Sequence, residues 1–421
     1  MIRKRIVIAA VIVGIFLGIF SRTLHEVYID YRSAKGLIGG SGRPMGGDFV
    51  CFYLAGQAAA NDHSNLYNWE NGRERQRALL NHPAGKEWVL PYVYPPPFAL
   101  LLIPFGKLDF LSANLAWIGF SLSLAFLSVF LVLSQSRFSR RQRIYASLSL
   151  LAFTPFTLDC LAGGQTSALG MLILAGIYYL TKKGRKFGAG LVLGFGYYKP
   201  PLFLFLALAF FLQKRWRLIG GALVSGFSLV LLSVIYLGSA GFIKYLEITK
   251  RYLYGRELIP GGVLPPEKAV GLLSFLVSNL PGNYAIAWTL YFVFFALALI
   301  FYLITLNRLD SKPVKDRSFD IRYALGITLS LLFSVQMCTY DVSLLFIPFL
   351  LTVEPIIRLG KQPAGLIGLA LVLFLFLTPL VDQIEFAGII IKPVMLLMIS
   401  WITYLFYLLT KESIIDQKCS I

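Results

Sequence analysis

The sequence predicts an all-α polytopic membrane protein, and its composition, hydropathy and charge placement each support that class. Of the 421 residues, 57% are hydrophobic and 14% are charged, whereas a soluble domain carries about 25% charged residues. The mean hydropathy is +0.71, so lipid must solvate most of the surface. The formal net charge of +18 comes from short Lys and Arg clusters between apolar runs, which is the positive-inside pattern. We therefore expect membrane lipids as partners and no nucleic acid.

The amino-terminal part predicts one span followed by a long outer loop. Met1–Arg5 is basic and predicts an inside terminus, and Ile6–Phe20 resembles a signal peptide. No Ala-x-Ala cleavage site follows it, so we interpret it as an uncleaved first span. Residues 21–111 then form the first outer (periplasmic) loop, with short amphipathic helices. Within it, Phe98–Phe105 is too short to cross a bilayer and is interpreted as interfacial or re-entrant.

The remaining apolar runs complete a single integral membrane domain over residues 1–421. A spanning helix needs roughly 20 apolar residues, and Lys and Arg in short loops set its direction. A second outer loop is expected at residues 238–283. The prediction is ten full spans with both termini inside: Ile6–Phe20, Ser112–Leu133, Ile144–Cys160, Thr166–Leu180, Leu218–Leu237, Tyr284–Leu306, Tyr323–Met337, Val342–Leu359, Leu366–Leu380 and Ile389–Leu409.

Two half-length apolar arms, Phe187–Tyr198 and Leu202–Leu212, flank the sequence Lys199-Pro200-Pro201. Each arm is about half a span at 1.5 Å per residue, and both outer flanks are basic. This pattern predicts a broken re-entrant helix pair with Lys199 at its tip, within the membrane, where broken backbone needs protein or a wet cavity to satisfy it. Lys199 can hold a lipid phosphate as a point charge, or its ammonium can reach an interface along its own alkyl stem.

Two carboxylates are the candidates for acid or base chemistry at the outer face. Asp48 starts an apolar run beside the membrane, where a carboxylate is costly unless it has partners or a task. Asp341, after Tyr340, lies in a tight corner between two predicted helices. A catalytic base must be ionised and within hydrogen-bond reach of the proton it takes. Helix capping is the alternative role for both residues, and for Asp48 the two roles are compatible.

Further polar groups are predicted at the same face. Gln165, in Gly163-Gly164-Gln165-Thr166-Ser167, can bond a sugar hydroxyl or can only satisfy the start of a helix. Tyr94 precedes three prolines and offers an aromatic face to a sugar ring, or it is an ordinary interfacial tyrosine. Arg251 and Arg256 can bind a lipid phosphate, or they are simply attracted to anionic headgroups.

No sequence signal points to a metal, a nucleotide or a disulfide framework. The four cysteines, Cys51, Cys160, Cys338 and Cys419, lack metal-ligand spacing. The topology allows a Cys51–Cys338 disulfide, but two unpaired thiols are expected. His25, His63 and His82 share one loop without regular metal spacing, and the chain has no Walker loop. We therefore expect no cofactor and no metal.

Together these motifs resemble the membrane glycosyltransferases of family 87, in the GT-C superfamily. The resemblance covers about residues 45–350 and is carried by Asp48-Phe49 with Tyr53 and Gly56, by Tyr94–Leu101, by Gly164-Gln165-Thr166, by Gly190–Gly196 before Lys199-Pro200, and by Tyr340-Asp341. It implies a GT-C-type fold and a polyprenyl-phosphate sugar donor, often mannose, with Asp48 as the catalytic base. In the family's α-mannosyltransferases the last corner is rich in histidine, so Tyr340-Asp341 is a departure that leaves the donor sugar and the acceptor open.

The resemblance implies an inverting hexosyltransferase-like enzyme of the cell envelope. It would move a sugar, mannose or another hexose or pentose, from a polyprenyl-phosphate carrier to a lipid or glycan acceptor. The site would face the exterior, or periplasm, at the cytoplasmic (inner) membrane, and we expect a monomer. Substrate would be bound by Tyr94, Gln165, Tyr340 and Asp341, and the lipid phosphate by Lys199, Arg251 and Arg256. The alternative is a transporter or flippase for a lipid-linked or small polar substrate, with Lys199 and the broken helix pair as its midplane site.

Overall fold

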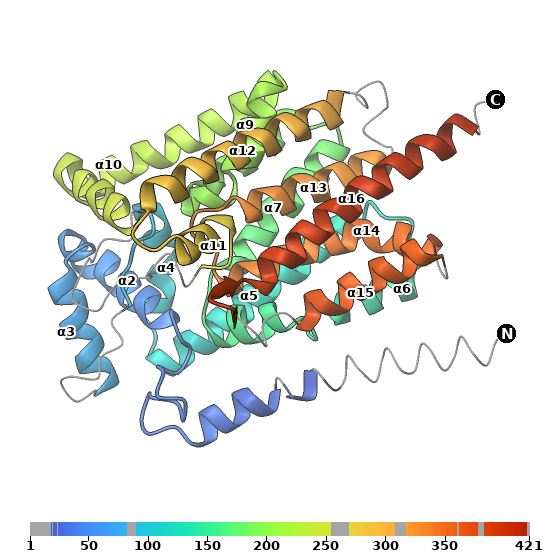
Figure 1. Cartoon of the computed structure of the whole chain (residues 1–421). Coiled ribbons are helices and arrows are strands. Elements are labelled where there is room, and N and C mark those ends of the chain that lie inside the picture. Colours follow the sequence, from blue (N-terminus) through green and yellow to red (C-terminus); the bar gives the residue numbers. More distant parts are fainter. Residues whose placement is uncertain are drawn as a thin grey trace.

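The computed structural model describes residues 18, 20–22, 24–81, 90–253, 269–307, 317–359, 362–377 and 383–418. In these ranges the chain is helical apart from loops and one antiparallel hairpin, formed by β1 (Ile384–Phe386) and β2 (Ile389–Ile391). The helices run roughly alongside one another as an elongated bundle (Figure 1). The all-α class is therefore confirmed. The predicted first span Ile6–Phe20 lies almost entirely outside the described residues.

Five of the described helices are long and apolar enough to cross a membrane. These stretches are Phe110–Leu133 (all of α5), Trp216–Arg251 within α10 (Trp216–Leu253), Tyr284–Thr305 within α12 (Tyr284–Asn307), Thr339–Leu359 (η6, Thr339–Leu345, with α14, Phe346–Leu359), and Pro393–Thr410 within α16 (Pro393–Lys418). Shorter apolar helices are α4 (Pro96–Gly106), α7 (Ser167–Lys182) and most of α15 (Pro363–Leu377). The chain is a multi-pass membrane protein, and the number of ten spans stays a prediction.

Several predicted spans have different boundaries in the structure: Tyr323–Met337, for example, corresponds to α13 (Arg317–Leu332). Two further differences have a clear cause in the backbone. The run Ile144–Cys160 is not one helix: α6 (Arg140–Ser149) ends before a bend, and a π-helical turn, η2 (Pro155–Ala162), follows. Pro155 explains the break, because proline has no N–H to donate to the carbonyl four residues earlier and its ring crowds that carbonyl. This carbonyl, Leu151 O, accepts from the Thr157 hydroxyl at 2.8 Å instead. The last span begins at Pro393 rather than Ile389, since Ala387 and Gly388 turn the chain at positive φ and leave Ile389–Ile391 as a strand.

The break predicted at Lys199 is present. Between α8 (Lys186–Gly194) and α9 (Leu204–Leu212) the chain forms two short 3-10 turns, η3 (Phe195–Tyr198) and η4 (Pro200–Leu202). Lys199 lies between the turns at φ −150°, ψ 72°. Protein groups satisfy the broken backbone: Lys199 N donates to Gly196 O at 3.0 Å, and the Ser330 hydroxyl of α13 (Arg317–Leu332) donates to Leu202 O at 2.8 Å. Such pairing is what backbone broken away from water requires.

Most of the helices in the segment predicted to form the first outer loop lie at one end of the bundle. There α2 (Phe49–Asn61), η1 (His63–Asn65), α3 (Trp69–Leu80) and α4 lie beside the end of α10 (Figure 1). Contrary to the sequence prediction, α2 is not amphipathic, because apolar residues on all its sides are buried. It packs against α4 through glycines: a Cβ at Gly56 would collide with Leu102 O, and one at Gly106 would meet the backbone of Gln57. This close contact fixes α2 against α4.

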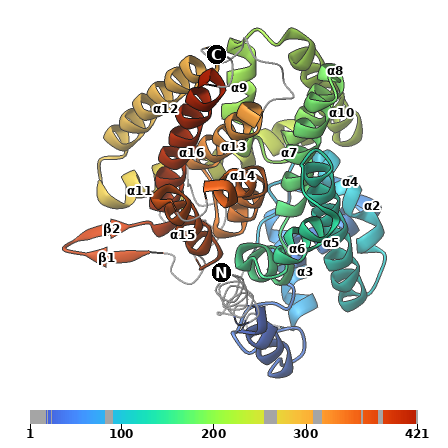
Figure 2. The ribbon, with the colours of Figure 1, turned by 90° about the vertical axis from the view of Figure 1, so that its right-hand side faces the viewer.

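The remaining elements complete the fold. Helix α10 kinks at Gly238 (φ 71°), where the second outer segment was predicted to begin, and α11 (Leu272–Asn279) lies in that segment. The β1–β2 hairpin projects sideways near α11 and α15 (Figure 2). The Asn279 side chain fixes it, since it exchanges two hydrogen bonds of 2.8 Å with the backbone of Ile390.

Candidate active site

Two glycine turns, distant in the sequence, interlock at the start of α2. Asp48 N donates to Gly163 O at 3.0 Å. Gly47 and Gly164 both have positive φ, of 55° and 65°. A Cβ on Gly47 would collide with Gly163 O, and one on Gly164 would collide with Gly46 O. Only glycine combines this backbone conformation with so close an approach, and the result places Asp48 beside Gln165.

The Asp48 carboxylate does not cap its helix. Asp48 stands at the N-cap position of α2 at φ −67°, ψ −11°, and its side chain makes no capping hydrogen bond. The side chain is half-buried. Burial raises the pKa of this carboxyl above its ordinary value, while hydrogen bonding from Gln165 and the positive charges of Lys199 and Arg43 oppose that shift. The carboxylate is therefore placed for another role than capping.

Lys199 and Asp341, which the sequence assigned to separate features, form a buried ion pair. Lys199 Nζ lies 2.8 Å from Asp341 Oδ1 and 2.6 Å from Oδ2. The Asp341 carboxylate also accepts from Cys338 N at 3.0 Å and from Ser167 Oγ at 3.4 Å, and Asp341 is only 1% exposed. The bond from Cys338 N shows that Asp341 does bind the start of its helix, as the capping alternative predicts. Lys199 Nζ also lies 4.6 Å from the centre of the Tyr340 ring.

Gln165 follows the second glycine turn and reaches the same site. It is 4% exposed, and within the described ranges its buried Oε1 atom has no hydrogen-bond partner. A buried polar atom without a partner is costly, so this oxygen is available to a hydroxyl donor. The next residue, Thr166, has its hydroxyl oxygen 3.1 Å from the hydroxyl of Tyr94.

Tyr94 connects the proline-rich segment to this site. Its ring stacks on Tyr198 at 6.4 Å and meets Phe52 edge-on at 5.2 Å. Packing thus occupies much of the aromatic face that the sequence offered to a sugar, and the hydroxyl is the part that points to Thr166. Sequence reasoning gave no role to Tyr198 or Ser167, although both adjoin residues that it singled out.

The sequence model of glycosyltransferase family 87 matches residues 92–335, which is more than half of the chain. The chain belongs to glycosyltransferase family 87. A search of curated proteins finds no match. Membership makes the chain a membrane glycosyltransferase. The matched stretch holds Tyr94, Gln165 and Lys199, whereas Asp48 and Asp341 lie outside it, so their roles rest on the geometry above.

The structure does not bring every predicted residue of this family 87 glycosyltransferase into the site. Arg251 is exposed near the end of α10, beyond the Gly238 kink, and Arg256 lies outside the described residues. Cys51, Cys160 and Cys338 are free, buried thiols. Within the described ranges, no group of three or more His, Cys, Asp or Glu gathers in a way that could hold a metal ion.

Proposed function

We propose that this glycosyltransferase transfers a sugar, mannose or another hexose or pentose, from a polyprenyl-phosphate carrier to a hydroxyl of a lipid or glycan. The transfer takes place on the outer face of the cytoplasmic membrane. The observation that carries the proposal is a half-buried Asp48 carboxylate without a capping bond, beside Gln165 and the Lys199–Asp341 pair. The Lys and Arg clusters in the short inner loops support the outward orientation.

Asp48 acts as the general base in a single displacement. Its carboxylate takes the proton from the acceptor hydroxyl, and the hydroxyl oxygen then forms a bond to the anomeric carbon. The bond from that carbon to the phosphate oxygen breaks, and its electron pair leaves with the lipid phosphate. Attack from the face opposite the leaving group inverts the anomeric configuration. Phosphate leaves as a stable anion and needs no acid, so one carboxylate suffices, unlike the pair in a glycosidase.

Gln165 and Lys199 prepare the two reactants. The unpartnered Oε1 of Gln165 accepts a hydrogen bond from a sugar or acceptor hydroxyl next to Asp48. Lys199 stabilises the negative charge that grows on the leaving phosphate, which is where fixed charges contribute most to the rate. Asp341 acts through Lys199 as a positioning residue, because four hydrogen bonds already occupy its oxygens. Arg251 attracts the lipid headgroup at the surface.

Reconstitution of the full chain in liposomes tests this donor. With a synthetic polyprenyl-phosphate mannose supplied, we expect a mannosylated lipid or glycan by mass spectrometry, and one equivalent of polyprenyl phosphate released per sugar transferred. A nucleotide-linked mannose supplied without the polyprenyl carrier is the matched control and is expected to give no product. Transfer from the nucleotide sugar alone would refute the proposed donor.

The pH profile of this reaction gives a separate prediction. Because burial raises the pKa of Asp48, the base is protonated, and activity is lost, at a higher pH than for an ordinary aspartate of pKa about 3.9. Gln165 opposes the shift by hydrogen bonding, so Gln165→Leu should move the acid limb of kcat/KM to still higher pH. Gln135→Leu, beyond the far end of α5, is the control. An acid limb at the ordinary value, unmoved by Gln165→Leu, contradicts the assignment.

A further inference from the structure

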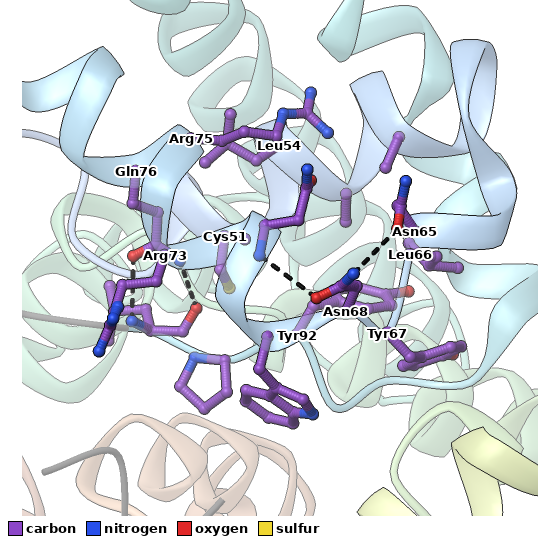
Figure 3. A pocket seen from close by; sticks show the side chains of 17 residues that line it. Cys51, Leu54, Asn65, Leu66, Tyr67, Asn68, Arg73, Arg75, Gln76 and Tyr92 are labelled. Atoms are coloured by element: carbon purple, nitrogen blue, oxygen red, sulfur yellow. Dashed lines mark hydrogen bonds between the residues drawn. The ribbon is translucent and has the colours of Figure 1, made fainter. Parts of the chain in front are cut away.

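A small pocket lies in the first outer segment, between α2, α3 and the chain that leads to α4 (Figure 3). Its volume is about 40 Å³. This space admits one small group and excludes a whole sugar ring. One wall is the face of α2 that carries Cys51, Leu54, Ala55 and Ala58. Cys51 follows Asp48 by three residues, slightly less than one turn, or about 4.5 Å along the helix at 1.5 Å per residue, so the pocket adjoins the proposed base.

Most of the polar side chains in this pocket already have hydrogen-bond partners within the protein. Gln76 exchanges hydrogen bonds of 2.8 and 3.0 Å with the backbone of Leu90. Asn68 donates to Asn65 Oδ1 at 3.0 Å and accepts from the backbone N–H of Asn71 at 3.3 Å (Figure 3). These bonds hold the walls in place. They also leave those amides with little capacity to recognise a neutral, hydroxyl-rich ligand.

Arg73 is the exception. Its Nε atom is the one buried side-chain nitrogen or oxygen among the lining residues that has no hydrogen-bond partner within the described ranges. A second arginine, Arg75, also lines the pocket and donates to Gln57 Oε1 at 3.0 Å, and no Asp or Glu belongs to the described lining. Arg73 is partly buried, and its Nε is enclosed without a hydrogen-bond partner. Enclosing part of a cation without a counter-charge is unfavourable, so the pocket favours an anion.

We propose that this pocket binds an anionic group, a phosphate or a carboxylate, carried by the acceptor, with Arg73 as the ligand. The inference rests on the proposed function, because it names the acceptor's chemistry at the same site. A guanidinium binds either anion through two parallel hydrogen bonds, and the volume suits one such group. The sugar ring or lipid that bears the anion then lies outside the pocket, with its hydroxyl at Asp48. The donor phosphate has a separate ligand in Lys199.

A binding experiment on the purified full chain tests the pocket without any transfer reaction. The probes are glucose 6-phosphate, glucuronate and glucose, measured by saturation-transfer NMR and titration. We expect at least one anionic probe to bind at least tenfold more tightly than glucose, and its identity distinguishes phosphate from carboxylate. Arg73→Gln should weaken that binding at least tenfold, whereas Arg32→Gln, an exposed arginine of the same outer segment, should leave it unchanged.

Two further variants keep the test decisive. Arg73→Lys retains the positive charge but lacks the two parallel N–H donors of the guanidinium, so we expect it to keep part of the anion binding. That result would show that the loss in Arg73→Gln does not come from unfolding. Asp48→Asn should bind the anion as well as the wild type does, so failure of the proposed base and failure of the pocket are separate outcomes. Equal binding of glucose and both anions, or unchanged anion binding in Arg73→Gln, would overturn the inference.

Discussion

Asp48→Asn is expected to lower the rate of sugar transfer roughly 10²- to 10⁴-fold, the range that a positioned general base contributes. The amide has nearly the same shape as the carboxylate but cannot take the proton of the acceptor hydroxyl. The structure lets this variant isolate chemistry from folding, because the Asp48 side chain makes no capping bond to α2. Single-turnover transfer from the lipid-linked donor measures the effect, and the thermal midpoint of the variant should stay close to that of the wild type.

Glu70→Gln is the matched control for that experiment. Glu70 is exposed in the first turn of α3, within the same outer segment, and the substitution changes charge and shape in the same way. It should leave transfer within about twofold of the wild-type rate, as expected for a surface position. If Asp48→Asn kept wild-type transfer, or if both variants lost it equally, Asp48 would not be the base.

The positions of the helix breaks could be predicted from the local sequence. The contacts that residues at these breaks make with distant parts of the chain could not. Lys199-Pro200-Pro201 ends a helix wherever it occurs, because proline lacks the N–H and restricts the residue before it. Gly238 likewise coincides with the predicted end of a span. The two wrong span boundaries, at Ile144–Cys160 and at Ile389, also lie next to prolines. Hydropathy alone carried the first of these spans across Pro155 and began the second at Ile389, before the helix start at Pro393. In both places the backbone, not the hydropathy, sets the boundary.

The site depends on contacts that no local pattern specifies. The sequence placed Asp48 and Gln165 at one membrane face, but the interlocking of Gly47 with Gly163, and of Gly164 with Gly46, appears only in the fold. Periodicity says which face of a helix is apolar, not which turn meets which turn. For the same reason, the sequence suggests only an acid or a helix cap for Asp341. Its partner, Lys199, lies between α8 and α9, far away in the chain.

The largest effect on stability is expected at that ion pair. Lys199→Met leaves the 1% exposed Asp341 carboxylate without its counter-ion, and breaking a buried pair in this way costs about 3–5 kcal/mol. The double variant Lys199→Met/Asp341→Asn removes both charges and should recover most of that loss. It should not recover transfer, because no ammonium remains to stabilise the leaving phosphate. Unfolding in mixed micelles and transfer in liposomes measure the two quantities separately.

Comparing the single and double variants shows whether Lys199 is only structural or also binds the donor phosphate. If Lys199 only neutralised Asp341, the double variant would regain activity together with stability. If Lys199 binds the donor phosphate, activity stays low while stability returns, and the KM for the lipid-linked donor rises, provided that donor binding is at equilibrium. Arg358→Met/Glu354→Gln is the matched control, since this surface pair of 2.9 Å joins neighbouring turns of α14. An exposed pair contributes about 0–1 kcal/mol, so both its stability and its transfer rate should remain near wild type.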